Sequence, residues 1–304
     1  AGMHVMIVGG GGREHALALA LRKNAAITDL SVLPGNGGIA AIADCYPVTA
    51  TDIDGICAFA AEHKVDFAVV AQDDPLAMGA VDRLQELGVR CFGPTAAAAR
   101  IESSKRFAKA LMQQNGIPTA RYEAFSAPEA ALSYLAAHSF PAVIKTDGLA
   151  LGKGVFIVSD MSEARAAIHA LMETKVFGRS GDNIIVEEFL VGPEVTVLAF
   201  TDGQTLIPMV SSMDHKRALD GDLGPNTGGM GVIAPNPFYT KEIAARCMEE
   251  IFLPTVRAMA ALGCPFRGCL YFGLMLTNDG PRVIEYNCRF GDPEAQAILP
   301  LLES

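Results

Sequence analysis

Short apolar runs alternate with amphipathic helical patterns along the first hundred residues. The apolar runs predict strands at 5–8, 30–33, 67–70 and 89–92, and the helical patterns predict helices at 14–21 and 79–87. Strands that alternate with helices are typical of a parallel sheet covered by helices. We therefore predict an α/β N-terminal domain with a parallel sheet over residues 1–102.

The pattern changes after Gly93-Pro94-Thr95, which begins a connecting region. A helix is predicted from 103 to 115, and strands are predicted at 142–146, 156–158 and 184–188. Two further helices alternate with these strands, at 126–137 and 160–172. Each follows a capping-box sequence, Ser126 to Glu129 and Asp160 to Glu163. This arrangement predicts a small α+β module.

The last third contains two predicted antiparallel pairs and one long helix. The first pair joins 195–200 to 205–210, and the second joins 269–276 to 282–286 through Asn278-Asp279-Gly280. A polar, glycine-rich loop is predicted from Asp214 to Gly231. The helix runs from 241 to 262 and is closed by Gly263.

The segment that follows the last predicted strand has the composition of an active site. In an extended chain Glu285, Asn287 and Arg289 would project from one face. A carboxylate and an amide oxygen suit Mg²⁺, which bridges substrate phosphates, and an arginine can stabilise a phosphoryl group in transfer. The alternative is a strand edge whose charges are only solvated.

Two glycine-rich loops follow the first two predicted strands. Gly9 to His15 can present backbone amides to an anion at the start of a helix, and Leu33 to Gly38 falls at the same edge of the sheet. The dinucleotide fingerprint fails because Glu14 and His15 stand where it needs glycine, which disfavours nicotinamide and flavin cofactors. The alternative is a tight strand-to-helix turn that needs glycine for packing.

Lys145 ends a predicted strand, and a loop with glycines at 148, 152 and 154 follows at once. Glycines that flank Lys153 favour a mobile loop that closes over phosphates, although the P-loop pattern is absent. Lys145 could instead extend its stem along the strand end to reach water. Farther on, Glu187 to Leu190 with Glu194 could bind a nucleoside, or form a charged hairpin edge that discourages aggregation.

The composition and net charge indicate which classes of binding partner the chain can have. The chain has 304 residues, 50% of them hydrophobic, and 34 acidic against 24 basic residues give a net charge of −10. This charge opposes nucleic-acid binding, and no apolar stretch is long enough to span a bilayer, so we expect a cytoplasmic protein without nucleic-acid or membrane partners. Seven scattered cysteines and dispersed histidines predict reduced, mostly buried thiols and no zinc site.

The chain resembles the ATP-grasp superfamily in a series of motifs that stand in the usual order. They are Lys105, Lys145, the 148–154 loop, Glu187 to Leu190 with Glu194, and Glu285-x-Asn287-x-Arg289. Three strings resemble, more narrowly, the phosphoribosylamine-glycine ligase family, also called glycinamide ribonucleotide synthetases. They are Asp214-His215-Lys216-Arg217, Gly224-Pro225-Asn226-Thr227-Gly228-Gly229-Met230-Gly231 and Asn287-Cys288-Arg289-Phe290-Gly291-Asp292-Pro293-Glu294. The Gly9 to His15 loop and Pro34-Gly35-Asn36 match the same family.

The resemblance implies an α+β ATP-grasp domain over 103–304, with a lid subdomain at about 120–190 and a central subdomain at about 191–304. It also implies an ADP-forming carbon-nitrogen ligase of purine synthesis, which joins glycine to 5-phosphoribosylamine through glycyl phosphate. ATP and Mg²⁺ would be required, with Mn²⁺ as an alternative ion.

The resemblance also implies roles for individual residues. Glu285 and Asn287 would hold the metal. ATP would be bound by Lys105, Lys145, Gly152, Lys153, Gly154, Glu187, Glu188, Phe189, Leu190 and Glu194. The substrates would be bound by Gly10, Gly11, Gly12, Arg13, Asn36, Pro225, Asn226, Thr227, Gly228 and Gly229. Catalysis would fall to Arg289, Lys153, Asp292 and Asp214.

Two features depart from the family. Ala71-Gln72-Asp73-Asp74 stands where members often carry Gly-Pro-Glu, which puts a ligand role for that loop in doubt. The sequence stops at Ser304 where the family continues with a C-terminal domain, so we expect a truncated form with weak or absent turnover by itself. Two alternatives stay open: an ATP-grasp ligase for another carboxylate, such as a biotin-carboxylase-like protein, and a nucleotide-binding fragment without catalysis.

Overall fold

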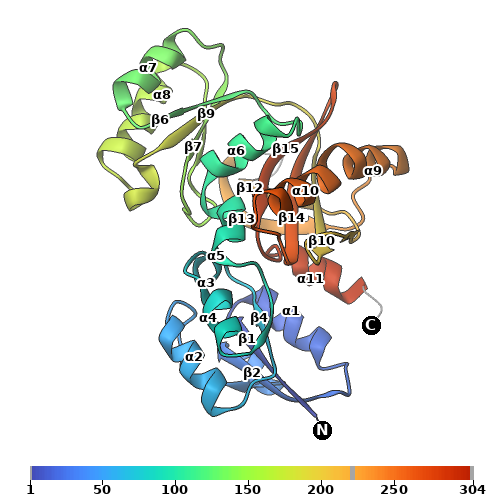
Figure 1. The fold of residues 1–304 in the computed structure, drawn as a ribbon. Helices are drawn as coiled ribbons and strands as arrows, with labels where there is room; N and C mark the ends of the chain where they lie inside the picture. Colours follow the sequence, from blue (N-terminus) through green and yellow to red (C-terminus); the bar gives the residue numbers. More distant parts are fainter. Residues whose placement is uncertain (1, 220–222, 302–304) are drawn as a thin grey trace.

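The N-terminal sheet has five parallel strands in the order β3-β2-β1-β4-β5, as shown in the lower part of Figure 1. In this computed structural model, residues 2–219 and 223–301 are described, without the side chains of 215–219, 223–230, 297 and 301. The strands are β1 (Met3–Gly9), β2 (Ile27–Pro34), β3 (Asp44–Cys45), β4 (Phe67–Val70) and β5 (Arg90–Phe92). The predicted parallel sheet is confirmed. The order reverses between β1 and β4, where open α/β sheets bind ligands.

The helices around this sheet are only partly those that the sequence predicted. They are α1 (Gly12–Leu21), α2 (Ile53–Glu62), α3 (Asp73–Ala77), α4 (Ala80–Glu86) and α5 (Ala96–Ser103), with a short 3₁₀ turn η1 (Ile39–Ala41). α1 and α4 were predicted. α5 lies where we expected a connecting region, and Thr95 caps it by accepting the Ala98 N–H at 3.3 Å.

The segment that we predicted as a lid subdomain, called the lid below, contains an antiparallel four-stranded sheet, β6-β9-β7-β8, with its helices on one side (Figure 1). Its elements are β6 (Tyr122–Phe125), α7 (Pro128–Ala136), β7 (Ala142–Thr146), β8 (Val155–Val158), α8 (Met161–Ile168), η2 (His169–Glu173), η3 (Gly178–Gly181) and β9 (Ile184–Glu188). Asp160 caps α8 as predicted, accepting the Glu163 N–H at 2.8 Å. The capping box predicted at Ser126 is wrong, because Pro128 takes the first helical position and makes Ala127 the N-cap.

The central part is a second antiparallel sheet, β11-β10-β14-β15. Its elements are α6 (Lys105–Gln114), β10 (Glu194–Thr201), β11 (Leu206–Pro208), α9 (Lys241–Cys247), η4 (Met248–Phe252), α10 (Leu253–Ala261), β14 (Gly268–Thr277), β15 (Gly280–Asn287), α11 (Glu294–Ile298) and η5 (Leu299–Leu301). Both predicted hairpins are confirmed. The long predicted helix is formed by α9, η4 and α10, which follow one another without a break.

The glycine-rich stretch predicted as a loop is instead an antiparallel strand pair. β12 (Met213–Leu219) pairs with β13 (Leu223–Ile233), with Asp214 opposite Val232. Glycine and proline are depleted in strands, so the local composition argued for a loop. The pairing of β12 with β13 outweighs the low strand preference of these residues, so the loop prediction is wrong.

Two of the three hydrophobic cores join the N-terminal sheet to the central sheet. Met6 and Val8 share one core with Val197 and Phe272. Another core contains Ile7, Val32, Leu198, Tyr271 and Phe290. The third lies entirely within residues 125–186 of the lid.

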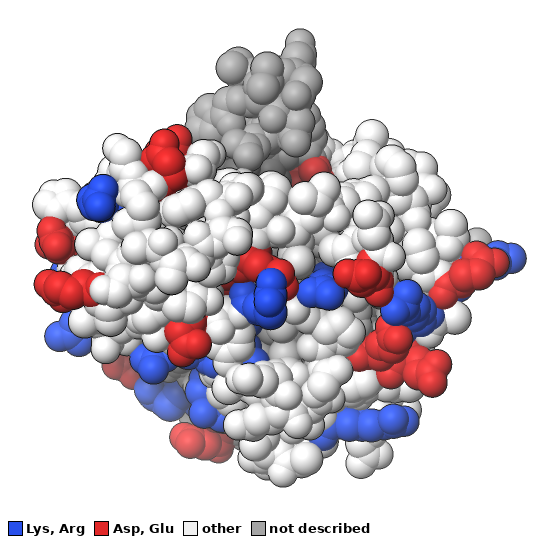
Figure 2. All heavy atoms as spheres, turned by 90° about the horizontal axis from the view of Figure 1, so that it is seen from above, with Lys and Arg blue, Asp and Glu red and all other residues white. Residues whose placement is uncertain are grey.

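The distribution of surface charge and the burial of the cysteines can be compared with the predictions from composition. In the view of Figure 2 acidic and basic side chains lie interspersed, without a broad area of one sign. All seven cysteines are free thiols, and five of them are buried, as predicted. Within residues 2–219 and 223–301, no helix has the length and apolar character needed to cross a membrane.

Candidate functional site

The predicted cluster lies at the end of β15. Glu285, Asn287 and Arg289 are each half-buried, whereas Tyr286, Cys288 and Phe290 between and after them are buried. The alternation expected for an extended chain is confirmed for Glu285 and Asn287, because Asn287 is the last residue of β15. Arg289 follows in a bend and joins this group through Glu102, which contacts both Asn287 and Arg289.

Glu102, at the end of α5, is a site residue that sequence reasoning missed. Its carboxylate accepts the Cys288 N–H at 2.8 Å and lies 3.4 Å from the Arg289 guanidinium. Burial raises the pKa of Glu102, and the positive charge of Arg289 opposes that rise. No local signal could have revealed it, because its partners lie 186 and 187 residues farther along the chain.

Glu102 also orients Asn287. The Asn287 amide is best assigned with its nitrogen toward two acceptors, Glu102 Oε2 at 3.2 Å and Tyr286 O at 3.0 Å. Its carbonyl oxygen then faces away from both acceptors, as a hard cation would require. With the Glu285 carboxylate on the same face, the donor set fits a magnesium ion that takes its other ligands from phosphates and water.

Lys105 and Lys145 lie beside this face. Lys145 Nζ donates to the Ile284 carbonyl at 3.2 Å, one residue before Glu285. Burial and the neighbouring Lys145 lower the pKa of Lys105, whereas the Glu285 carboxylate acts in the opposite direction. The structure thus brings together two lysines, a carboxylate and an amide from α6, β7 and β15.

The predicted phosphate loop lies against the start of α6. Lys105 Nζ donates to the Gly148 carbonyl at 3.5 Å, and Arg106 N–H donates to Asp147 at 2.8 Å. Gly152 has a φ of +72°, in the left-handed region that favours glycine. Lys153 is exposed between Gly152 and the buried Gly154, so its ammonium can reach a ligand only from the tip of the loop.

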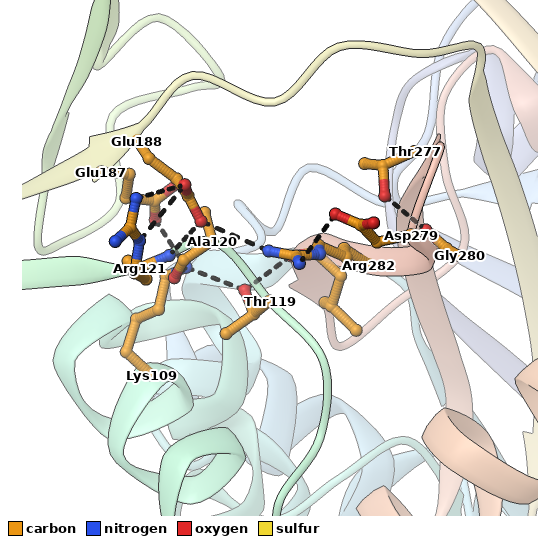
Figure 3. Close-up of polar contacts among 11 residues, drawn as sticks. Lys109, Thr119, Ala120, Arg121, Glu187, Glu188, Thr277, Asp279, Gly280 and Arg282 are labelled. Atoms are coloured by element: carbon orange, nitrogen blue, oxygen red, sulfur yellow. Dashed lines mark hydrogen bonds and ion pairs between the residues drawn. The ribbon is translucent and has the colours of Figure 1, made fainter. Parts of the chain in front are cut away.

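The Glu187 to Leu190 segment divides its side chains between the interior and the surface. Glu187 is buried between Lys109 and Lys145, with one Nζ at 3.0 Å from each carboxylate oxygen. Figure 3 shows Glu188 turned instead toward Arg121 and Arg282, which donate to it from 2.9 to 3.4 Å. Phe189 is exposed, and Leu190 is half-buried. Lys109 and Arg121 were not singled out in the sequence.

The two N-terminal glycine-rich loops lie together, as predicted. Asn36 Nδ2 donates to the Gly10 carbonyl at 2.9 Å, and a side chain at Gly10 would meet the Gly35 carbonyl at 2.6 Å. Glu14, which breaks the dinucleotide fingerprint, is fully buried and accepts the Gly11 N–H at 3.2 Å. Tight packing therefore explains Gly10, whereas the helix N-terminus beside it still suits an anion.

The same loop meets the far end of the chain. Arg13 donates from its guanidinium to the Phe290 carbonyl at 3.0 Å and from its backbone to Asp292 at 3.4 Å. Asp292 is exposed and also accepts from Gln296 at 2.6 Å. Predicted substrate and catalytic residues from opposite ends of the chain thus lie side by side.

Asp73, at the start of α3 in the loop that departs from the family, lies close enough to Glu102 and Arg289 for its charge to act on both. Burial is the main cause of the raised pKa of Glu102, Arg289 opposes it, and the negative charge of Asp73 adds to it. The loop after β4 therefore supplies a carboxylate close to the predicted cluster, although its Gly-Pro-Glu sequence is lacking.

The remaining predicted residues are less closely described. Asp214 is half-buried on β12, and Glu194 is exposed at the start of β10. The side chains of Pro225, Asn226, Thr227, Gly228 and Gly229 lie outside the described part, although their backbone belongs to β13. Among the described side chains, no three His, Cys, Asp or Glu residues are grouped to hold a metal ion.

A groove of about 660 Å³ lies away from this cluster, beside the β14–β15 turn. It is lined by Arg121, Arg246 and Arg282 among others. These three arginines are paired with three carboxylates, Glu188, Glu250 and Asp279. The groove therefore lacks the excess positive charge that a phosphate site needs.

Comparisons with known proteins agree with this geometry. Residues 3–102 match the family model of the phosphoribosylglycinamide synthetase N domain, and residues 103–295 match that of its ATP-grasp (A) domain. The chain is 46% identical to a phosphoribosylamine–glycine ligase of Caldanaerobacter subterraneus, over 99% of this chain and 72% of the relative. It is 47% identical to the human trifunctional purine biosynthetic protein adenosine-3, over 99% of this chain and 30% of the relative.

A comparison with a solved structure shows similarity to the same family. The crystal structure of phosphoribosylamine–glycine ligase from Thermotoga maritima superposes with a TM-score of 0.85 at 33% identity, over 98% of this chain and 72% of that one. The chain thus spans about 70% of the length of these ligases and under a third of the human protein. With both domain models matched in order, the chain belongs to the phosphoribosylglycinamide synthetase family.

Proposed function

We propose that this chain carries the nucleotide and substrate sites of an ATP-dependent ligase that joins glycine to 5-phosphoribosylamine. The products are glycinamide ribonucleotide, ADP and phosphate. One observation carries the proposal: Lys105, Lys145 and Arg289 converge on the face that holds Glu285 and Asn287. The relatives are named for this reaction, and family membership disfavours the biotin-carboxylase-like alternative.

The reaction needs this concentration of positive charge. The glycine carboxylate must attack the γ-phosphoryl group of ATP, breaking its bond to ADP, before the amine of phosphoribosylamine displaces phosphate from glycyl phosphate. Both partners in the first step are anionic, so Lys105, Lys145 and Arg289 reduce their repulsion. Glu285 and Asn287 would hold Mg²⁺, or Mn²⁺ as an alternative, and the ion would reduce the negative charge of the phosphates.

We assign the nucleoside to the segment that links β9 to β10. Because the side chains of Glu187 and Glu188 are already paired with basic residues, this segment would use its backbone and the side chains of Phe189 and Leu190. Glu194 would accept the ribose hydroxyls. Lys153, with Gly152 and Gly154, would close over the phosphates and keep water from the acyl phosphate.

We assign the sugar phosphate to the start of α1, at Gly10, Gly11, Gly12 and Arg13 with Asn36. The amides at this helix N-terminus favour an anion. Asp292 and Asp214, with residues 225–229, would border the two acceptor sites. Support for this placement comes from the contact between Arg13 and Asp292, which sets the N-terminal loop beside the β15 cluster.

Coupled ADP release is the direct test. With the family's C-terminal domain supplied, we expect release in the presence of ATP, Mg²⁺, glycine and freshly generated phosphoribosylamine, and loss of release when either acceptor is omitted. Release that depends on bicarbonate and not on glycine would support a different carboxylate. ATP binding without phosphate release, even with the family's C-terminal domain added, would support a nucleotide-binding fragment. A requirement for that domain and a cytoplasmic location stay predictions of the sequence.

A further inference from the structure

Lys109 is a buried cation that lies behind the predicted nucleotide site. Its side chain on α6 is 4% exposed. Figure 3 shows its ammonium among three acceptors: Glu187 Oε1 at 3.0 Å, Thr119 Oγ1 at 2.8 Å and the Ala120 carbonyl at 3.3 Å. Two of these contacts are hydrogen bonds and the third is an ion pair, so all three hold the ammonium in place.

Glu187 shares its charge between two lysines. Lys145 lies 3.0 Å from Oε2, and Lys109 lies 3.0 Å from Oε1. Oε1 has no partner in hydrogen-bonding geometry among the described residues, so its interaction with Lys109 is ionic. Burial alone would raise the pKa of Glu187, but the two lysines outweigh it and keep the carboxylate ionised.

The second lysine matters because Lys145 has two tasks. A lysine that binds ATP phosphates must direct its ammonium toward them, which weakens its contact with Glu187. A buried carboxylate that loses its only counter-ion is strongly destabilised. Lys109 is held in place by Thr119, which in turn donates to the Val283 carbonyl of β15 at 2.7 Å, so it stays beside Glu187.

We propose that Lys109 is a positioning residue, which neutralises Glu187 so that Lys145 can bind the phosphates of ATP. This inference rests on the proposed function, because it requires a nucleotide at Lys145. Lys109 itself does not touch the nucleotide. A merely structural role would instead stabilise α6 and β9 without regard to phosphate.

Nucleotide affinity separates the two roles. We would measure dissociation constants for ATP with Mg²⁺, and for adenosine by competition with a fluorescent nucleotide. We expect Lys109→Met to weaken ATP binding by roughly tenfold to a hundredfold, because ATP must then bind beside an unpaired carboxylate. Adenosine has no phosphate, so its affinity should change by less than about twofold, within the range of ordinary surface substitutions.

A double variant tests the stated cause. Adding Glu187→Gln removes the carboxylate that Lys109 neutralises, so Lys109→Met with Glu187→Gln should bind ATP as Glu187→Gln alone does. The matched control is Lys175→Met, which removes a lysine paired with Asp182 at the surface. We expect this control to bind both ligands as the unmodified protein does. If Lys109→Met does not fold, the affinities for ATP and adenosine would be compared between the charge-balanced double variant and Lys109→Arg instead.

Three outcomes would overturn the inference. They are unchanged ATP affinity in Lys109→Met, an equal loss for ATP and adenosine, and no rescue by Glu187→Gln. Failure of the unmodified protein to bind ATP would overturn the proposed function as well. The ATP affinity of the unmodified protein therefore shows whether the proposed function or only the role of Lys109 has failed.

Discussion

Glu102 holds Asn287 and Arg289 in the arrangement on which the candidate site depends. Its carboxylate is buried and contacts the Cys288 amide, the Arg289 guanidinium and the Asn287 side chain. A carboxylate with several partners in the interior is costly to remove, because each partner is left with an unmet charge or hydrogen bond.

Replacing Glu102 should therefore lower stability in a graded way. We expect Glu102→Ala to lower the free energy of unfolding by about 3–5 kcal/mol, the usual cost of breaking a buried ion pair. Glu102→Gln keeps an acceptor for the Cys288 N–H and should cost less. Urea unfolding would measure both, with the exposed Glu86→Ala as a control that changes by under about 0.5 kcal/mol. Equal stability of Glu102→Ala and the unmodified protein would contradict the role.

Arg289 should act on turnover more than on nucleotide binding. If it stabilises charge that develops during phosphoryl transfer, Arg289→Ala should lower kcat by about a hundredfold or more. The ATP dissociation constant should change much less, because Lys105 and Lys145 remain. Comparing kcat for ADP release with ATP affinity in an active form of the protein tests this, and equal losses in both would count against it.

At the scale of elements, predictions succeeded where a local pattern decides the structure. β7 and β9 begin and end where the sequence predicted, because each is a short apolar run that ends in polar residues. α5 was missed, since its alanine-rich sequence has no clear polar and apolar period. The β12–β13 pair was missed for a different reason, because its glycine- and proline-rich sequence is depleted in strands although the two segments pair as neighbours in the chain.

The residues of the candidate site also fall into two groups, those that a local pattern predicts and those that it does not. Glu285 and Asn287 were predictable, because alternation within β15 places them on one face, and Arg289 follows two residues later in the same motif. Glu102 and Lys109 were not, since each reaches its charged partner across more than seventy residues of sequence. Contacts of this kind depend on how the elements pack, and no spacing rule encodes them.

The contact between β9 and β15 gives an element-scale prediction with a pH dependence. Glu188 on β9 binds Arg282 of β15 and Arg121 before β6. Partial burial alone would raise the pKa of Glu188, but the hydrogen bonds from Arg121 and the charge of Arg282 outweigh it. Because its pKa is lowered, Glu188 stabilises the fold above its unfolded pKa of about 4.3, and this is lost as pH falls through the folded value.

Glu188→Gln should therefore be less stable than the unmodified protein at pH 7, and the difference should shrink as pH falls below about 4.3 and Glu188 becomes protonated in the folded protein. Urea midpoints at several pH values would measure this difference. Glu123→Gln changes an exposed residue of β6 and should show no such trend. A difference that stayed constant with pH would show that the Glu188 charge does not contribute.

For the whole molecule, the cores divide the chain differently from the family models. The models separate residues 3–102 from 103–295, whereas two hydrophobic cores cross that boundary and the third is confined to the lid. Three phenylalanines mark the crossing: Phe290 lies 6.0 Å from both Phe92 and Phe200, measured between ring centroids. The N-terminal and central sheets should therefore open as one cooperative unit.

Phe290→Ala tests this unit. Removing a buried phenylalanine should lower the free energy of unfolding by about 3–5 kcal/mol. Hydrogen exchange should show the same loss in peptides from β1 and from β14, because both strands pack on the shared core, and a smaller loss in β9 of the lid. The control Phe238→Ala removes a side chain that is 48% exposed and should change none of these peptides. Loss of protection in β14 with none in β1 would show that the two sheets open independently.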